Sequence, residues 1–281
     1  MLSALIRDAE ADYNLRARHP EREAVYADYA ARSQRLRQAL PPLSLRYASA
    51  PRCTIDWFAP PVTAQGPMPL LAFFHGGFWR GGDKTMFGFI AEPFLQAGVA
   101  VALVGYELAP AVSITDIVRQ ATQAMRYLFE QRAELGFDAA RVSVSGHSAG
   151  GHLAAVLGSL DAEALDGYAI AGVVGLSGLY ALQPFLLSSV NLEARMTLDE
   201  AELLSPASYG RFGAQRFMLA VGAEETDGFR QQTAYFSRHL DAIGQGHDVM
   251  VCPGRTHFDI FEDFVSPEAP LFRRALALVS A

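Results

Sequence analysis

Residues Arg141-Val-Ser-Val-Ser-Gly-His-Ser-Ala-Gly150 read as an apolar strand that runs into a sharp turn. The turn contains the pattern Gly-x-Ser-x-Gly at Gly146, Ser148 and Gly150, and the run Gly151-His-Leu-Ala-Ala-Val-Leu157 then favours a helix. Such a strand–turn–helix strains the serine and lifts its hydroxyl clear of the sheet. Only small residues at positions 146 and 150 let the backbone pass so closely, and the helix N-terminus favours negative charge at Ser148. The stretch therefore predicts a nucleophilic serine at a strand end.

On both sides of this turn, the chain alternates between short apolar runs and helix-like stretches. The expected strands are Leu43–Tyr47, Cys53–Phe58, Leu70–Phe74, Val99–Val104, Arg141–Ser145, Ile170–Leu176, Phe217–Val221 and Asp248–Cys252. The expected helices between them are Phe87–Gln96, Ile114–Leu135, Ala149–Leu160, Phe229–Ile243 and Ser266–Ser280. From Leu70 onward the runs lack period-two alternation, as strands buried on both faces do. We therefore expect an α/β fold with a mostly parallel eight-stranded sheet and helices on both faces.

The chain of 281 residues has no Gly/Ser/Pro-rich linker that would divide it, so we expect a single domain over residues 1–281. The first forty residues are charged and read as a helical lead, about 1–40. Residues of about 179–210 contain no clear strand and are too many for a tight crossover. We expect them to form a cap-like insertion over the edge of the sheet where α/β folds bind ligands.

Composition excludes several classes of protein. Half of the residues are apolar (51%), and 23 Lys and Arg stand against 30 Asp and Glu without any block of like charge. A nucleic-acid or anionic-membrane partner is therefore not expected. Glycines and Pro184 interrupt the longest apolar stretch, Ala169–Leu187, which favours a strand and turn over a membrane span. Because residues 1–14 do not resemble a signal peptide and Cys53 and Cys252 read as buried thiols, we expect a cytoplasmic protein.

A second glycine-rich loop, Phe73-Phe-His-Gly-Gly-Phe-Trp-Arg-Gly-Gly82, follows an expected strand. It lacks the lysine pattern of a phosphate-binding loop, since Lys84 is not followed by Ser or Thr. Acyl transfer needs backbone N–H groups that point at a tetrahedral oxyanion, and glycines let the main chain approach it. We expect the N–H groups of Gly77, Phe78 and Ala149 to form this oxyanion hole, with Gly76 as a substitute. His75 is expected to orient the loop.

A nucleophilic serine needs a base, and the chain has seven histidines. His147 and His152 flank the nucleophile, where local geometry makes them poor bases. His257 lies in a loop after the last expected strand and before the terminal helix. This position after the last strand makes His257 the expected base.

The third member should be a carboxylate that fixes the tautomer of this histidine. It should follow the strand Phe217–Val221, where Glu224, Glu225 and Asp227 all qualify. We choose Glu225, because three residues beyond Gly222 is the usual offset. Asp227 is expected to cap the following helix.

Together these residues resemble the arylformamidase (kynurenine formamidase)-like branch of the α/β-hydrolases, near the hormone-sensitive-lipase-type esterases. The resemblance covers nearly the whole chain. Its marks are Asp12-Tyr13-Asn14, Asp56-Trp57-Phe58-Ala59-Pro60, His75-Gly-Gly-Phe-Trp79 with Gly82-Asp83-Lys84, Tyr106-Glu-Leu-Ala-Pro110, Gly146-His-Ser-Ala-Gly150, Ser205-Pro206 and His257-Phe258. Two departures stand out. The acid of the family is often Asp, whereas Glu225 stands here, and Ala181 follows Tyr180 where the branch often has an acidic residue.

The resemblance implies the α/β-hydrolase fold and a serine hydrolase that forms an acyl-enzyme on Ser148 without a metal or cofactor. Its substrate would be a small ester or an N-formyl aryl amide, and a homodimer is compatible with it. Trp79, Tyr180 and His147 are the expected substrate-binding residues, and Phe78, Trp79 and Tyr180 are expected to form an aromatic wall. The alternatives are a general short-chain carboxylesterase, a ligand-binding relative without catalysis, and a phosphate-binding enzyme that uses the Gly76–Gly82 loop.

Overall fold

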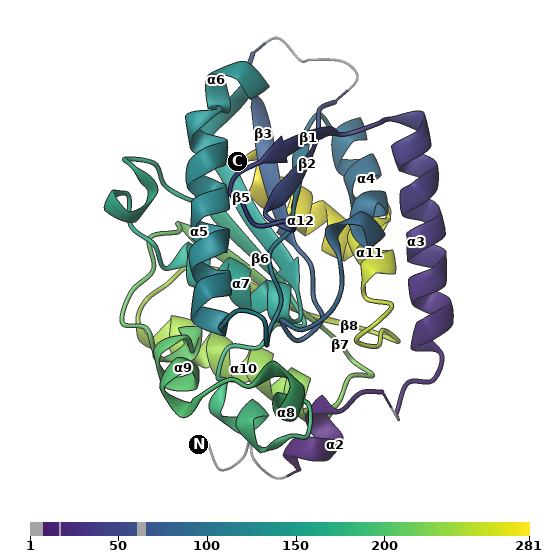
Figure 1. The fold of residues 1–281 in the computed structure, drawn as a ribbon, viewed down its shortest axis with the longest axis vertical. Helices are drawn as coiled ribbons and strands as arrows, with labels where there is room; N and C mark the ends of the chain where they lie inside the picture. Colours follow the sequence, from purple (N-terminus) through teal and green to yellow (C-terminus); the bar gives the residue numbers. More distant parts are fainter. Residues whose placement is uncertain (1–7, 17, 61–65) are drawn as a thin grey trace.

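A computed structural model describes residues 8–16, 18–60 and 66–281 (Figure 1). One sheet of eight strands runs through it in the order β1-β2-β4-β3-β5-β6-β7-β8. The strands are β1 (Leu43–Arg46), β2 (Thr54–Phe58), β3 (Met68–Phe74), β4 (Ala100–Val104), β5 (Phe137–His147), β6 (Gly172–Leu176), β7 (Arg216–Gly222) and β8 (His247–Cys252). Pairing is antiparallel between β1 and β2 and between β2 and β4, and parallel from β4 to β8. The predicted mostly parallel eight-stranded sheet is confirmed.

Helices cover both faces of this sheet because its central strands are apolar on both sides. Along β3, Leu70, Ala72 and Phe74 belong to one core and Leu71 and Phe73 to the other. The first core includes residues of α5 (Ile114–Glu130), α7 (Ala149–Gly158) and α10 (Asp227–Ala242). The second includes residues of α3 (Arg22–Ala39), α4 (Ala91–Gln96), α11 (Phe261–Val265) and α12 (Pro270–Ser280), which Figure 1 shows together on one side.

Several expected helices are shorter or divided in the structure. The stretch expected at 87–96 consists of a 3₁₀ helix, η1 (Lys84–Ile90), followed by α4. The stretch expected at 114–135 is broken at Gln131 into α5 and the short α6 (Arg132–Leu135). The terminal helix α12 starts at Pro270 rather than Ser266, because proline fits the first turn of a helix and not its interior.

The lead expected over residues 1–40 contains two helices, α2 (Ala9–Tyr13) and α3, while residues 1–7 and 17 lie outside the described residues. Helix α2 contacts α10, and the Thr226 hydroxyl donates to the Asp12 carbonyl at 2.9 Å. Helix α3 packs on η1, and the Tyr29 hydroxyl donates to the Phe258 carbonyl at 3.1 Å. The lead thus reaches parts of the chain more than 200 residues away.

Residues 179–210, between β6 and β7, form short helices without a strand. They are η3 (Gln183–Leu187), α8 (Asn191–Ala194), α9 (Leu198–Leu203) and η4 (Pro206–Ser208). Helix α2 contacts η3, and Figure 1 shows α2, α8, α9 and α10 gathered at one end of the molecule. Within the described residues, no helix is both long and apolar enough to cross a membrane.

Candidate active site

The turn from β5 into α7 places Ser148 in a strained backbone conformation, with φ 57° and ψ −120°. Such a conformation costs about 1–3 kcal/mol, so the surrounding structure must hold it. A Cβ on Gly146 would stand 2.1 Å from the Gly150 carbonyl oxygen, and a Cβ on Gly150 would stand 2.0 Å from that of Phe74. The sharp turn expected from Gly-x-Ser-x-Gly is therefore present, and both glycines are required by close backbone contacts.

A histidine–carboxylate pair lies near this turn. His257 Nδ1 donates to Glu225 Oε2 at 2.8 Å, and both side chains are buried. The other oxygen of Glu225 accepts from the Ser177 hydroxyl at 2.6 Å and from the Gly222 N–H at 2.7 Å. Three donors thus fix the carboxylate, and the bond to Nδ1 leaves Nε2 of His257 as the basic nitrogen.

The structure distinguishes among the three acids that the sequence left open. Glu225 is 3% exposed and contacts His257, whereas Glu224 and Asp227 are exposed. The expectation that Asp227 caps helix α10 is wrong. Thr226 is the N-cap residue and makes no side-chain capping bond, while Asp227 is the first helical residue and pairs with Arg230.

His147 connects the serine turn to the loop of His257. Its Nε2 donates to the His257 carbonyl at 2.8 Å, and the two rings lie 4.5 Å apart between centroids. Burial, followed by the neighbouring His257, lowers the pKa of His147 well below its usual value. Because His147 is 3% exposed and does not line the cavity described below, its expected role in substrate binding is not supported. It fastens the strand end before Ser148 to the His257 loop.

The loop after β3 brings a run of left-handed residues against the serine. Gly77, Phe78 and Trp79 have φ values of 122°, 49° and 57°, and the Gly77 carbonyl accepts from the Arg80 and Gly81 amides. Among the described residues, the N–H groups of Gly77 and Phe78 find no acceptor. Ala149 opens α7, where a helix leaves its first N–H groups unpaired. These three amides are therefore free to bind an anion.

The loop passes close to the nucleophile and is held from behind by His75. A Cβ on Gly76 would stand 3.1 Å from Ser148 Cβ. His75 is fully buried and stacks on Tyr106 at 4.3 Å, and the Tyr106 hydroxyl donates to the His75 carbonyl at 2.6 Å. Burial lowers the pKa of His75 to about 4, so this ring is neutral at pH 7. These contacts fit the structural role expected for His75.

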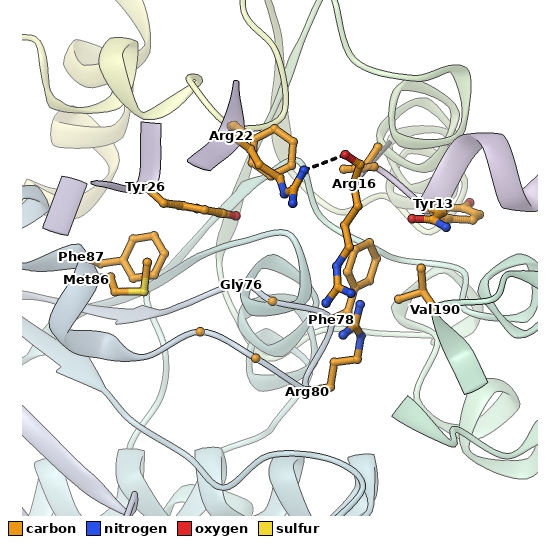
Figure 2. Close-up of a pocket in the computed structure, with 16 residues that line it drawn as sticks. Tyr13, Arg16, Arg22, Tyr26, Gly76, Phe78, Arg80, Met86, Phe87 and Val190 are labelled. Carbon is orange, nitrogen blue, oxygen red and sulfur yellow. Dashed lines mark hydrogen bonds between the residues drawn. The ribbon is translucent and has the colours of Figure 1, made fainter. Parts of the chain in front are cut away.

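A cavity of about 270 Å³ opens beside this loop (Figure 2). Its described lining comes from the loop, the N-terminal lead, η1 and Phe258, together with Val190 of the β6–β7 segment. The aromatic lining residues are Tyr13, Tyr26, Phe78, Phe87 and Phe258. The sequence marked Tyr13, Asn14 and Phe258 only as parts of family motifs and gave no sign that the lead reaches the cavity.

Of the three residues expected to form an aromatic wall, Phe78 lines the cavity, whereas Trp79 and Tyr180 do not. The side chains of Trp79 and Tyr180 are fully buried. The Trp79 ring packs edge-on against Phe185, and Tyr180 stacks on Phe236 at 4.3 Å between centroids. Positive φ at Trp79 accompanies a side chain turned into the core, whereas the Phe78 side chain takes the cavity side. Within residues 8–16, 18–60 and 66–281, no three His, Cys, Asp or Glu side chains are grouped so as to hold a metal ion.

Comparison with known proteins decides the family. A kynurenine formamidase of Danio rerio is 30% identical over 228 residues, which cover 78% of this chain and 75% of the relative. The chain belongs to the kynurenine formamidase family. A kynurenine formamidase of Salmo salar is 28% identical over 88% of this chain and 84% of its own length, and the family model described as BD-FAE matches residues 55–177. The predicted resemblance to arylformamidase-like α/β-hydrolases is confirmed.

Solved structures support the fold. A candidate thioesterase from Silicibacter sp. TM1040 superposes with a TM-score of 0.84 at 30% identity, over 98% of this chain and 99% of the other. Esterase B from Lactobacillus rhamnosis superposes with a TM-score of 0.72 over 95% and 96% of the two chains, at 22% identity, and so supports the fold. This member of the kynurenine formamidase family is an α/β-hydrolase enzyme that acts on ester or amide substrates.

Proposed function

We propose that the protein is a serine hydrolase that cleaves small, aromatic N-formyl amides or carboxylic esters through an acyl-enzyme. The observation that carries the proposal is the buried Glu225–His257 pair beside the strained turn of Ser148. In this proposal Ser148 is the nucleophile, His257 the general base and Glu225 the carboxylate that orients it. The relatives named kynurenine formamidase support a formamide as one substrate class.

The reaction would run in two halves. His257 Nε2 takes the proton of the Ser148 hydroxyl as its oxygen attacks the acyl carbon. The N–H groups of Gly77, Phe78 and Ala149 bind the oxyanion, and the resulting imidazolium protonates the leaving amine or alcohol. Water, activated by the same histidine, then releases the acid and restores Ser148.

Ser148→Ala tests the nucleophile. We expect kcat to fall by about 10⁶ while the melting temperature stays close to that of the wild type, because the covalent route is lost and the fold is not. Ser159→Ala is the control, since its hydroxyl only bonds the Val156 carbonyl at the end of α7. A fluorophosphonate should label Ser148 alone in peptide mapping. Label on another residue, or an active Ser148→Ala enzyme, would contradict the mechanism.

A second measurement separates the two substrate classes. The ratio of kcat/KM for an aryl formamide to that for the matching aryl acetate tells whether the enzyme is a formamidase or a short-chain esterase. We expect both to be cleaved by the same serine, and the formamide to be preferred. A strong preference for the acetate would favour the esterase.

A further inference from the structure

The cavity is unusual in its charge. Three arginines line it, Arg16, Arg22 and Arg80, and its described lining contains no Asp or Glu. The whole chain carries a formal charge of −7, so this local excess of cations runs against the overall balance. Arginines that come from two separate segments and face one small cavity are suited to binding an anion.

Arg80 lies two residues after Phe78 in the loop beside Ser148. Its side chain is 12% exposed, and NH1 donates to Glu193 Oε2 at 2.6 Å. Its Nε is buried and has no hydrogen-bond partner among the described residues. A guanidinium has five N–H donors in a planar fork, and the exposed Glu193 occupies only part of this fork. Arg80 therefore has donors left for a ligand.

Arg16 approaches the same carboxylate from the N-terminal lead. Its NH1 lies 3.8 Å from Glu193 Oε1, and Figure 2 shows the ends of Arg16 and Arg80 converging beside Phe78. Burial and then the nearby Arg16 lower the pKa of Arg80, and Glu193 opposes this effect. Glu193 is 57% exposed, and ion pairs with such surface residues contribute little to stability. One exposed carboxylate thus serves two guanidinium groups.

Arg22 differs from these two residues. Its NH1 donates to the Arg16 and His19 carbonyls at 2.6 and 3.1 Å, and NH2 donates to Glu23 at 2.6 Å. It therefore shapes the turn that carries Arg16 (Figure 2). Its charge still adds to the positive potential of the cavity.

We propose that Arg80 and Arg16 form a subsite for a carboxylate group of the substrate. An aromatic body would lie against Phe78 and its aromatic neighbours in the cavity, and the carboxylate would bind the two guanidinium groups in place of Glu193. The enzyme then prefers aromatic esters or formamides that carry a carboxylate to their neutral counterparts. This preference for carboxylate-bearing substrates rests on the function proposed above, because the preference assumes that cleavage occurs at Ser148.

Kinetics with matched substrates tests the preference. The substrates are 3- and 4-acetoxybenzoate and their methyl esters, and cleavage of the acetate ester is followed in each. The readout is kcat/KM for the free carboxylate divided by kcat/KM for the corresponding methyl ester. We expect Arg80→Gln and Arg16→Gln each to lower this ratio by about tenfold, as the loss of a charged hydrogen bond does. Glu193→Gln should raise the ratio, because it removes the competing carboxylate. Arg18→Gln, an exposed arginine of the same lead outside the cavity lining, is the control and should leave the ratio unchanged.

Equilibrium binding gives a readout that needs no turnover. Calorimetry would compare 3- and 4-hydroxybenzoate with their methyl esters on the wild type and the same variants. We expect the acids to bind more tightly than the esters, and the difference to shrink about tenfold in Arg80→Gln and with added NaCl. Two variants on different segments protect the test against misfolding of either one, which melting curves would detect.

The outcomes separate the two proposals. If neither the acetate esters nor an aryl formamide is cleaved but the hydroxybenzoates bind in an Arg80-dependent way, the proposed function fails and the subsite stands. If the methyl esters are cleaved and neither the kinetic ratio nor binding depends on Arg80 or Arg16, the subsite is wrong and the function stands. An equal effect of Arg18→Gln would also overturn the subsite, because net charge alone would then explain the result.

Discussion

At the scale of single residues, the candidate site depends on a buried carboxylate that accepts three hydrogen bonds. Glu225 accepts from His257, Ser177 and the Gly222 amide, so the imidazole is held through Nδ1 and its Nε2 stays free of this bond. The side chain one position earlier, Glu224, is exposed and has none of these contacts. A shift of one residue along the chain thus separates a buried orienting carboxylate from a solvated one.

Glu225→Gln should lower kcat by about 10²–10⁴, since the amide keeps the shape but loses the charge that supports the His257 imidazolium. Glu224→Gln is the matched control and should change kcat less than about twofold, because its side chain is in water. Steady-state kinetics on the preferred substrate, with melting curves for both variants, makes the comparison. Equal losses in the two variants would remove Glu225 from the mechanism.

At the scale of the elements, strands β3 to β7 could be predicted because each contains a run that is buried on both faces, whereas the edge strands β1 and β8 are largely exposed or half-buried. The helix ends could not, since they depend on local backbone geometry, as at Gln131, and on tertiary contacts, such as that of Thr226 with Asp12. The Glu225–His257 contact followed from the chain order of the motifs and the strand end at Gly222. Arg16 and Arg80 gave no such signal, because no periodicity tells which loops meet over a cavity.

The close approach of α7 to the end of β3 should make Gly150 intolerant of a larger side chain. In Gly150→Ala the new Cβ would meet the Phe74 and His75 carbonyl oxygens at 2.0 and 2.6 Å, so helix or strand must shift. We expect a loss of about 1–3 kcal/mol in the free energy of unfolding, together with a loss of activity because the Gly76–Gly82 loop that follows β3 is displaced.

Gly210→Ala is the control for this substitution. A Cβ at Gly210 would have no neighbour within 4 Å, and its φ is not positive. Urea unfolding of both variants should show the loss only at position 150. A Gly150→Ala protein of normal stability and activity would mean that the close backbone contact is not needed.

At the scale of the whole molecule, one buried side chain joins three distant segments. Gln232 of α10 accepts from the Tyr180 and Ala181 amides at 2.8 Å each, and it donates to the Ala181 carbonyl at 2.7 Å and the Tyr13 hydroxyl at 2.9 Å. It is fully buried. The N-terminal lead and the β6–β7 segment are thus attached to α10 through one amide.

Gln232→Leu should therefore destabilise the protein strongly. The substitution leaves four buried polar groups without this partner, and each costs about 1–3 kcal/mol. Tyr13→Phe removes only one of the four hydrogen bonds and should cost about 1 kcal/mol. Chemical denaturation measures both. If Gln232→Leu were no less stable than Tyr13→Phe, the amide would not be what holds these segments together.

The contacts of the N-terminal lead also bear on how the protein is made. The bond from Thr226 to Asp12 spans 214 residues and the bond from Tyr29 to Phe258 spans 229. At 5–20 residues per second, a ribosome needs about 10 to 45 s to pass from one partner to the other. During translation, the lead must wait for α10 and the loop of Phe258 before it can settle. The cavity wall that it provides is then among the last parts of the nascent chain to form.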